Sequence, residues 1–580
     1  MSSYQPFLIS GSDQGLETDK QSFLLPDKAF PVLENAYVWR DRVRKREGLR
    51  FLGRLRRVLT SQAQANADGT SNYDIADILT SFRTEEPNAE LESGSIVITV
   101  DAGGGNETEF TDQGDGTLSR TSGSAYDVDP GTYIDYSTGA IHIEWDAGGT
   151  PGVGISVEAN FSYYPTLPVM GIVQRERSNT NFEQTLVFDT RYCYVFDGSS
   201  YSEYLSATST TWNGSNSQFF WGINYRTSDE ASRNLFVTNF NQDSSGNPIR
   251  YTDGSTWTDF EPSIASTQVF SESLGTLTTP WTSFGPVNLS NTPVTAGTVT
   301  ITVSNGTDPD VIFTDEKLDG TLTGSPSTSS GTIDYDTGEI NLTISPAMTV
   351  DATITADYKY DSSYLFSAAI LIPYYGRLVA LNTFEGATRG TSTQYFNRAR
   401  FSQVGSPVQS GAWDSTIFGR GGFIDAPTNE EIISARFFKN TLIVSFERST
   451  WELRYVGEYG LPFVWERISS DYGSESRFST VLFDEGVLQV GNRAIVSATS
   501  QTVNRIDEKI PDTVFAFMNQ NDGTVRVHGI RDFQKEIVYW CYNDSTATEG
   551  NSVFPNKALV YNYRNNTWAT FRNNITTSGS

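Results

Sequence analysis

The side chains that most often carry catalysis or metal binding are scarce in this chain. Its 580 residues include two histidines, His142 and His528, and two cysteines, Cys193 and Cys541. The histidines are far apart and each falls in a strand-like pattern, so a zinc site or a Ser–His–Asp triad has almost no material. Both cysteines lie in aromatic strand-like runs. We expect buried free thiols there, and neither a disulfide nor a site.

Carboxylates are abundant, with 69 acidic against 41 basic side chains and a net charge of -28. Two acidic turns, 112–116 and 315–320, contain oxygens that suit a hard cation such as calcium. Neither has EF-hand spacing, and Asp with Gly is also what a tight turn requires, so we expect turns. No acid pair for glycoside hydrolysis stands out. The acids considered for it are Glu430, Glu431, Glu458 and Asp471. We expect no catalytic centre, metal or cofactor.

One short segment is strongly basic. Nine of the 41 basic residues lie between positions 40 and 57: Arg40, Arg42, Arg44, Lys45, Arg46, Arg50, Arg54, Arg56 and Arg57. In an acidic chain this indicates either a dock for an acidic partner protein or the polar face of a strand, since alternate positions from 40 to 46 are arginines. DNA binding fits less well, because no aromatic base-stacking pattern accompanies the run. We predict a protein interface.

The elements that must position these residues are expected to be β-strands. Aromatic residues make up 13% of the chain and there are 49 glycines. Aromatic and β-branched side chains favour pleated surfaces, and Gly and Asn favour turns, so the composition predicts an all-β protein. A short helix is expected only over Ile75–Phe82. The length exceeds what one core holds, which predicts several domains.

A recurring hairpin predicts how the strands are grouped. Residues 250–260 and 561–571 each read as a strand, a polar turn and a strand with Trp and then Phe three positions on. Because side chains alternate along a strand, these aromatics should face opposite sides and need cover on both. The hairpins and their preceding strands read as β-propeller blades, with an array of β-sandwiches as the open alternative. The six candidate blades are 172–208, 217–262, 365–405, 428–468, 476–510 and 520–572.

A second repeat predicts two related small β-domains of the sandwich type. Four blocks match in the same order, beginning with Gly94–Val100 against Gly297–Val303. The second copy interrupts the blades, so it is an insertion whose ends should lie close together. The expected domains are an N-terminal arm and the strands that follow it (1–93), copy one (94–164), blades (165–296), copy two (297–360) and blades (361–580).

The N-terminal sequence has neither the basic region nor the apolar core of a signal peptide, and no apolar run reaches the length of a membrane span. We expect a soluble chain made in a cytoplasm and not exported by the usual route.

Several sequence segments resemble those of one protein family. They are Phe-Pro-Val-Leu-Glu-Asn-Ala-Tyr-Val at 30–38, the arginine-rich strand that follows it, and the blade-like segments at 251–257, 376–381, 398–405 and 442–446. Together they resemble the tail nozzle, or tail-hub (tail tubular), proteins of short-tailed, podovirus-like bacteriophages. The resemblance covers most of the chain outside the two small domains.

The resemblance implies a non-enzymatic virion protein with a propeller-like body. Such subunits form a homohexameric tube below the portal and adaptor, retain the genome and then conduct it during ejection; tail fibres are further potential partners. No catalytic residues are carried over. Proteins of this family assemble in the host cytoplasm and leave by lysis. An acidic surface suits the role, because it limits binding of the passing DNA. The alternatives are a propeller-based carbohydrate-active enzyme and a glycan-binding adhesin.

Overall fold

The computed structural model describes residues 13–103, 105–176, 183–206, 211–226, 233–241, 247–278, 282–458, 460–491, 493–511, 526–544 and 554–572. The protein is all-β, as predicted, with 50% of its residues in strands. In the described residues two short 3-10 segments, Ser22–Leu24 and Arg389–Thr391, accompany them. The chain divides into two compact units. One comprises 47–175 and 182–216, and the other 1–46, 176–181 and 217–580.

The first unit contains the first small β-domain, built from two sheets. The larger sheet has the order β10-β9-β8-β13-β5, with β7 also paired to β13. Its strands are Leu118–Ser122 (β10), Glu107–Asp112 (β9), Val97–Asp101 (β8), Ser156–Tyr164 (β13), Arg57–Ala63 (β5) and Glu90–Leu91 (β7). The smaller sheet comprises Tyr133–Asp135 (β11), Ala140–Glu144 (β12) and Asn72–Ile75 (β6). Alternating side chains such as Ile96, Ile98 and Val100 form the buried core between them.

The helix expected over Ile75–Phe82 does not form. Ile75 ends β6, where it pairs with Ile141, and residues 78–85 are consecutive turns. The Asp77 carboxylate accepts the backbone N–H of Leu79 at 2.9 Å and so fixes a turn at this point. Sheet pairing on one side and this turn on the other leave too few residues for a helix.

Six groups of four consecutive strands follow the chain outside the small domains. The first lies in the same unit as the first small domain, apart from Glu176: Gly171–Glu176 (β14), Glu183–Phe188 (β15), Cys193–Phe196 (β16) and Tyr201–Glu203 (β17). The second is Trp221–Arg226 (β18), Arg233–Thr238 (β19), Ile249–Thr252 (β20) and Trp257–Phe260 (β21). The third is Ala352–Tyr374 (β29), Arg377–Gly386 (β30), Thr393–Phe401 (β31) and Gly422–Asp425 (β32).

The remaining three groups complete the second unit. They are Ile432–Phe438 (β33), Thr441–Phe446 (β34), Thr450–Tyr455 (β35) and Phe463–Ser469 (β36); Val481–Phe483 (β37), Gly486–Val490 (β38), Ile495–Ala498 (β39) and Val503–Arg505 (β40); and His528–Asp532 (β41), Ile537–Tyr542 (β42), Lys557–Asn562 (β43) and Thr567–Arg572 (β44). Each predicted blade segment therefore contains antiparallel strands of one group, and the third group extends to Asp425. Their arrangement as propeller blades stays a prediction.

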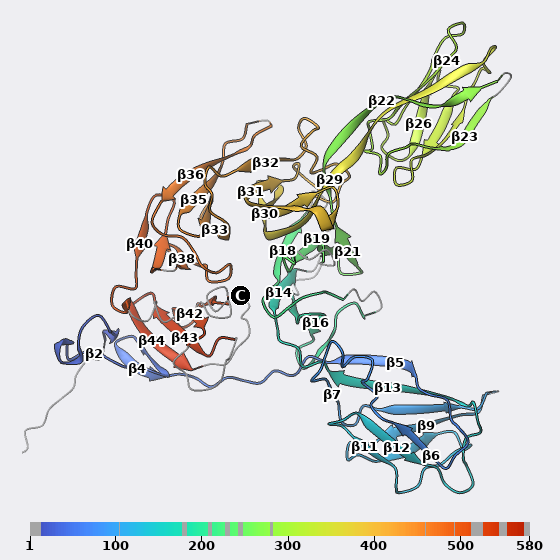
Figure 1. The fold of residues 1–580 in the computed structure, drawn as a ribbon. Coiled ribbons are helices and arrows are strands. Elements are labelled where there is room, and N and C mark those ends of the chain that lie inside the picture. Colours follow the sequence, from blue (N-terminus) through green and yellow to red (C-terminus); the bar gives the residue numbers. More distant parts are fainter. Residues whose placement is uncertain are drawn as a thin grey trace, which may run out of the picture. The chain divides into compact units, whose positions relative to one another are not determined.

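The second small domain is inserted between the second and third groups. Its strands are Ser263–Leu277 (β22), Ser283–Asn288 (β23), Thr300–Ser304 (β24), Val311–Thr314 (β25), Thr321–Ser325 (β26), Ser330–Ile333 (β27) and Glu339–Thr343 (β28), together with the first part of β29. Figure 1 shows β22 and β29 side by side as the ribbon that enters and leaves this domain, and their register runs from Ser263↔Tyr364 to Leu277↔Ala352. The expected closeness of the two ends of the insertion is thus seen directly.

The duplicated unit is larger than the matched sequence blocks. In copy one β5 pairs with β13 and β6 with β12; in copy two β22 pairs with β29 and β23 with β28. The repeated pairing therefore begins near residues 57 and 263, before the expected starts at 94 and 297. The segment 1–93 therefore does not belong to one domain. Residues up to 46 lie in one unit and residues from 47 onward in the other.

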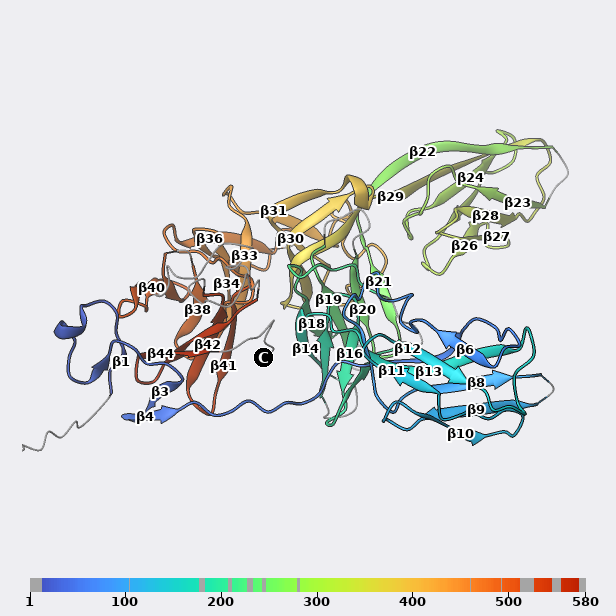
Figure 2. The ribbon, with the colours of Figure 1, turned by 60° about the horizontal axis from the view of Figure 1, so that its bottom comes forward.

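The N-terminal arm fastens onto the last strand group. Its strands are Gly15–Leu16 (β1), Ala29–Phe30 (β2), Ala36–Trp39 (β3) and Arg42–Lys45 (β4). Figure 2 shows β1 and β3 beside β44. The backbone N–H of Asn35 donates to the Thr570 carbonyl at 2.8 Å, and Asn562 Nδ2 donates to the Val38 carbonyl at 2.9 Å. Leu33, Tyr37 and Val38 share a buried core with β42–β44, so residues over 500 positions apart pack together.

The paired aromatics of the recurring hairpins are covered on both faces, as predicted. Trp257, Phe260, Trp568 and Phe571 are all buried. Trp568 packs against Trp540 and Tyr561, with ring centroids 6.1 and 4.4 Å away. Phe571 meets Tyr37 of the arm at 6.1 Å. At the last group, the arm therefore supplies part of the cover.

Candidate functional site

The predicted basic interface begins on the β3–β4 hairpin. Trp39 pairs directly with Arg42, so Arg40 and Asp41 form a two-residue turn, and both have positive φ (49° and 59°). This is the backbone twist that tight hairpins require. Arg40 therefore lies in the turn and does not continue the strand alternation that the sequence suggested. Within the part of the chain that the structure describes, β4 pairs only with β3, and all four of its side chains are exposed.

Several arginines of the hairpin are held by aromatic rings. The guanidinium carbons of Arg40 and Arg44 lie 4.2 and 3.8 Å from the Trp39 ring centroid. Arg46 donates to the carbonyl of Arg572 and lies 5.5 Å from the Phe571 ring, which fixes the hairpin to β44. The hairpin is thus a positioned basic surface and not a mobile tail.

Three other members of the basic run form ion pairs within the first unit. Arg54 pairs with Glu90 at 2.7 Å, and Arg56 with Glu92 at 3.3 Å. Arg57 is buried, with 8% of its surface exposed. It donates to Glu203 at 2.9 Å and to the Tyr163 hydroxyl at 2.7 Å. Burial opposes its charge, but Tyr163 and Glu203 outweigh this and raise the pKa of Arg57.

The nine basic residues divide between the two units. Arg40–Arg46 belong to one unit, and Arg50, Arg54, Arg56 and Arg57 to the other. In the described residues Arg42, Lys45 and Arg50 are exposed and have no ion pair. The surface that a partner can reach is thus best represented by the β4 edge, which we call the basic edge: Arg42, Val43, Arg44 and Lys45.

The other residues that the sequence singled out have structural surroundings. His142 lies on β12, where Nδ1 is 2.6 Å from Asp74 Oδ1, and His528 lies on β41 in the other unit. Burial lowers the pKa of His528 to about 4. Cys193 and Cys541 are buried free thiols, as predicted. No group of three or more His, Cys, Asp or Glu side chains suited to a metal occurs among the described residues.

In each acidic turn, an aspartate accepts hydrogen bonds from backbone N–H groups. Asp112 accepts from the N–H groups of Gly94 and Gly114 at 2.7 and 2.8 Å and from the Tyr136 hydroxyl at 2.6 Å. In copy two, Asp315 accepts from the Gly297 N–H at 2.7 Å and the Val299 N–H at 3.0 Å. Both carboxylates are buried, so the same device closes the same turn in each small domain.

Of the four acids considered for hydrolysis, two bind neighbouring groups. Glu430 accepts from Ser449 Oγ at 2.9 Å and from the Arg448 N–H at 3.0 Å. Glu431 accepts from Asn382 Nδ2 at 2.7 Å. Glu458 and Asp471 are exposed and lie outside the strands. Glu431 also lines a cavity, which the sequence did not predict.

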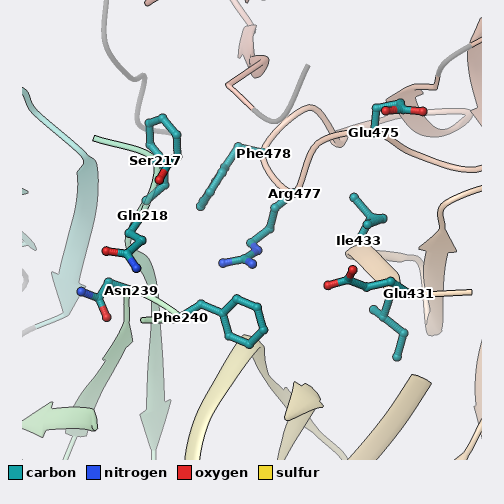
Figure 3. Close-up of a pocket in the computed structure, with 11 residues that line it drawn as sticks. Ser217, Gln218, Asn239, Phe240, Glu431, Ile433, Glu475, Arg477 and Phe478 are labelled. Carbon is teal, nitrogen blue, oxygen red and sulfur yellow. The ribbon is translucent and has the colours of Figure 1, made fainter. Parts of the chain in front are cut away.

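That cavity lies within the second unit and has a volume of about 210 Å³. It is lined where β18, β33 and β37 begin and β19 ends. Figure 3 shows Arg477 extending toward Gln218 and Asn239, with Phe240 and Phe478 on either side and Glu431 behind. The Arg477 guanidinium carbon is 4.9 Å from the Phe240 ring centroid. Phe478 stacks on His528 at 4.9 Å, which holds this wall in place.

Two ionisable side chains that line the cavity have shifted pKa values. Burial lowers the pKa of Arg477 to about 10, with Glu431 acting in the opposite direction. Burial also raises the pKa of Glu475, and the nearby Glu447 adds to this. Sequence reasoning named Glu431 only as one acid among many and missed Arg477 and Glu475, because the cavity residues come from loops between positions 217 and 478. The only local signal is a Ser-Glu-Ser-Arg-Phe-Ser phrase at 474–479, which is not a known motif.

Comparisons with known proteins add no identification. No protein family matches the chain and no curated protein matches it. Apo AztD from Citrobacter koseri is 10% identical, with 71% of this chain and 94% of that one covered and a TM-score of 0.22. The extracellular domain of a hybrid two-component system from B. thetaiotaomicron is 8% identical, with 81% and 75% covered and a TM-score of 0.13. Such low scores carry no structural argument. In the described residues, the helices are all too short or too polar to span a membrane.

Proposed function

We propose that this protein is a structural, non-enzymatic virion component: the distal tail tube, or nozzle, of a short-tailed bacteriophage. In this role six or so copies form a ring below the portal and adaptor, retain the genome and then conduct it during ejection. The protein is made in the host cytoplasm and resides in the tail. Its six strand groups act as propeller blades, and its two small domains are additions to that body.

The observation that carries the proposal is the succession of six four-strand groups, interrupted once by the inserted domain. This is the order expected of the propeller-based body that the sequence resemblance implies. The net charge of -28 also agrees with it, because an acidic surface gives DNA phosphates no cations to replace their counterions.

The basic edge supports assembly through protein contacts. An exposed strand edge offers unpaired backbone groups to another chain, and its cations attract an acidic partner. The rest of the chain is strongly acidic, so a second copy is itself a suitable partner. The hairpin's attachment to β43 and β44 holds this edge in a fixed position for docking.

Charge reversal tests this role. Arg42→Glu with Lys45→Glu removes two exposed cations that have no ion pair in the described residues. We expect the double variant to fold but to lose ring formation on a portal–adaptor complex, as measured by native mass spectrometry and negative-stain imaging. The matched control is Arg454→Glu with Arg564→Glu, which makes the same charge change at exposed positions elsewhere. Equal assembly by both double variants would refute a docking role for the basic edge.

A further inference from the structure

The cavity described above contains a cation, Arg477, that forms no ion pair in the described residues, although Glu431 lines the same cavity. Among the described residues no carboxylate lies within ion-pair distance of Arg477, and its closest aromatic contact is Phe240 at 4.9 Å. A guanidinium stays protonated at neutral pH even when its pKa is lowered. Arg477 is partly exposed, so a ligand that displaces its water must replace the lost hydrogen bonds with acceptors of its own. The site therefore favours a group that brings acceptor oxygens to Arg477.

A second unpaired donor lines the same cavity. Asn239 is 2% exposed, and its Nδ2 has no hydrogen-bond partner. Its Oδ1 accepts the Asn241 N–H at 3.3 Å, which fixes the amide orientation. Figure 3 shows Arg477 and Asn239 on adjoining walls, with the guanidinium directed toward this side of the cavity. An unsatisfied buried amide beside a guanidinium without an ion pair suits a ligand with several acceptors, and a planar oxyanion fits a guanidinium best.

The remaining walls restrict the ligand further. Phe240, Phe478 and Ile433 provide apolar surface, and a volume of about 210 Å³ admits a small ring or a short chain. Glu431 and Glu475 also line the cavity. Because two acidic groups lie nearby, a doubly charged phosphate is disfavoured relative to a single carboxylate.

We propose that this cavity binds a small monocarboxylate with an apolar body. The carboxylate pairs with Arg477 and accepts from Asn239, and the apolar part packs between the phenyl rings. The site is independent of the proposed assembly role, since none of its residues belongs to the basic edge.

Calorimetric titration of the full chain with benzoate tests the proposal, with benzamide as the neutral analogue and inorganic phosphate as the competing oxyanion. We expect benzoate to bind the wild-type protein and benzamide and phosphate to bind at least about tenfold more weakly, because a charge-assisted bond is lost or a second charge is added. Arg477→Gln should weaken benzoate by about tenfold or more, whereas Arg454→Gln, a surface control, should leave it within about twofold.

A thermal scan of the unliganded proteins separates binding from a structural role. Arg477→Gln removes a charge that forms no ion pair in the described residues, so its unfolding temperature should equal or exceed that of the wild type, and benzoate should raise only the wild-type value. Absence of benzoate binding, equal binding of benzamide, preference for phosphate, or an unliganded Arg477→Gln protein that melts clearly earlier would each overturn the inference.

Discussion

Replacing Glu385 by Gln tests how the third strand group is held together. Glu385 lies on β30 and its side chain is only 4% exposed. It accepts from Arg400 at 2.7 and 2.8 Å and from Arg398 at 2.9 Å. Arg398 also pairs with Asp425, but among the described residues Arg400 has no other carboxylate, and its Nη1 has no hydrogen-bond partner. Glu385→Gln therefore leaves Arg400 as a buried cation without a counter-charge.

Removing one partner of a buried ion pair costs about 3–5 kcal/mol. Because Gln keeps one acceptor, we expect the lower end, about 3 kcal/mol. Hydrogen exchange suits this large chain better than a global unfolding midpoint, which assumes two-state behaviour. At about 1.4 kcal/mol per tenfold, amides of β30 and β31 should exchange roughly 100-fold faster.

Two further variants make this result interpretable. Glu466→Gln breaks the Arg454–Glu466 pair, whose side chains are 49% and 46% exposed, and should cost about 0–1 kcal/mol. Adding Arg400→Met to Glu385→Gln should restore part of the protection, because it removes the uncompensated charge. If Glu385→Gln changed exchange no more than Glu466→Gln does, the buried cluster would not stabilise the sheet as argued.

Two other predictions concern the small domains and the first strand group. Asp112→Ala and Asp315→Ala each leave buried backbone donors unpaired, so each should destabilise its own small domain by about 2 kcal/mol or more. The effect should be seen as faster amide hydrogen exchange in that copy alone. Hydrogen exchange that is unchanged in both copies would contradict the shared role. Burial raises the pKa of Asp189 to about 7. Between about pH 4 and pH 7 the folded chain then retains a proton that the unfolded chain releases, so stability should fall as pH rises, and Asp189→Asn should lack this component in urea unfolding; parallel pH profiles of the two proteins would refute it.

Much of the fold was predictable because strands leave a local signal. Alternation at Ile96, Ile98 and Val100 marks β8 and its buried face, and the paired Trp and Phe of the hairpins mark strands covered on both sides. The extent of the duplicated domain was not predictable, since β5 and β22 have diverged in sequence and only their pairing with β13 and β29 reveals the relation.

The basic run shows a different limit. Its composition indicated a surface, but only the register Trp39↔Arg42 shows that Arg40 is a turn residue, and only tertiary contacts show that Arg57 is buried. The cavity could not be predicted from the sequence for the same reason. Asn239, Glu431 and Arg477 converge through the packing of separate strand groups, and no spacing along the chain encodes that convergence.

The most direct test of the central proposal is the mass of the purified protein, measured with and without a portal–adaptor complex and paired with negative-stain images. The account predicts sixfold rings, either from the protein alone or formed on the portal–adaptor template. A protein that stays monomeric in the presence of that template would contradict the tail-tube role and would direct attention to carbohydrate binding or cleavage instead.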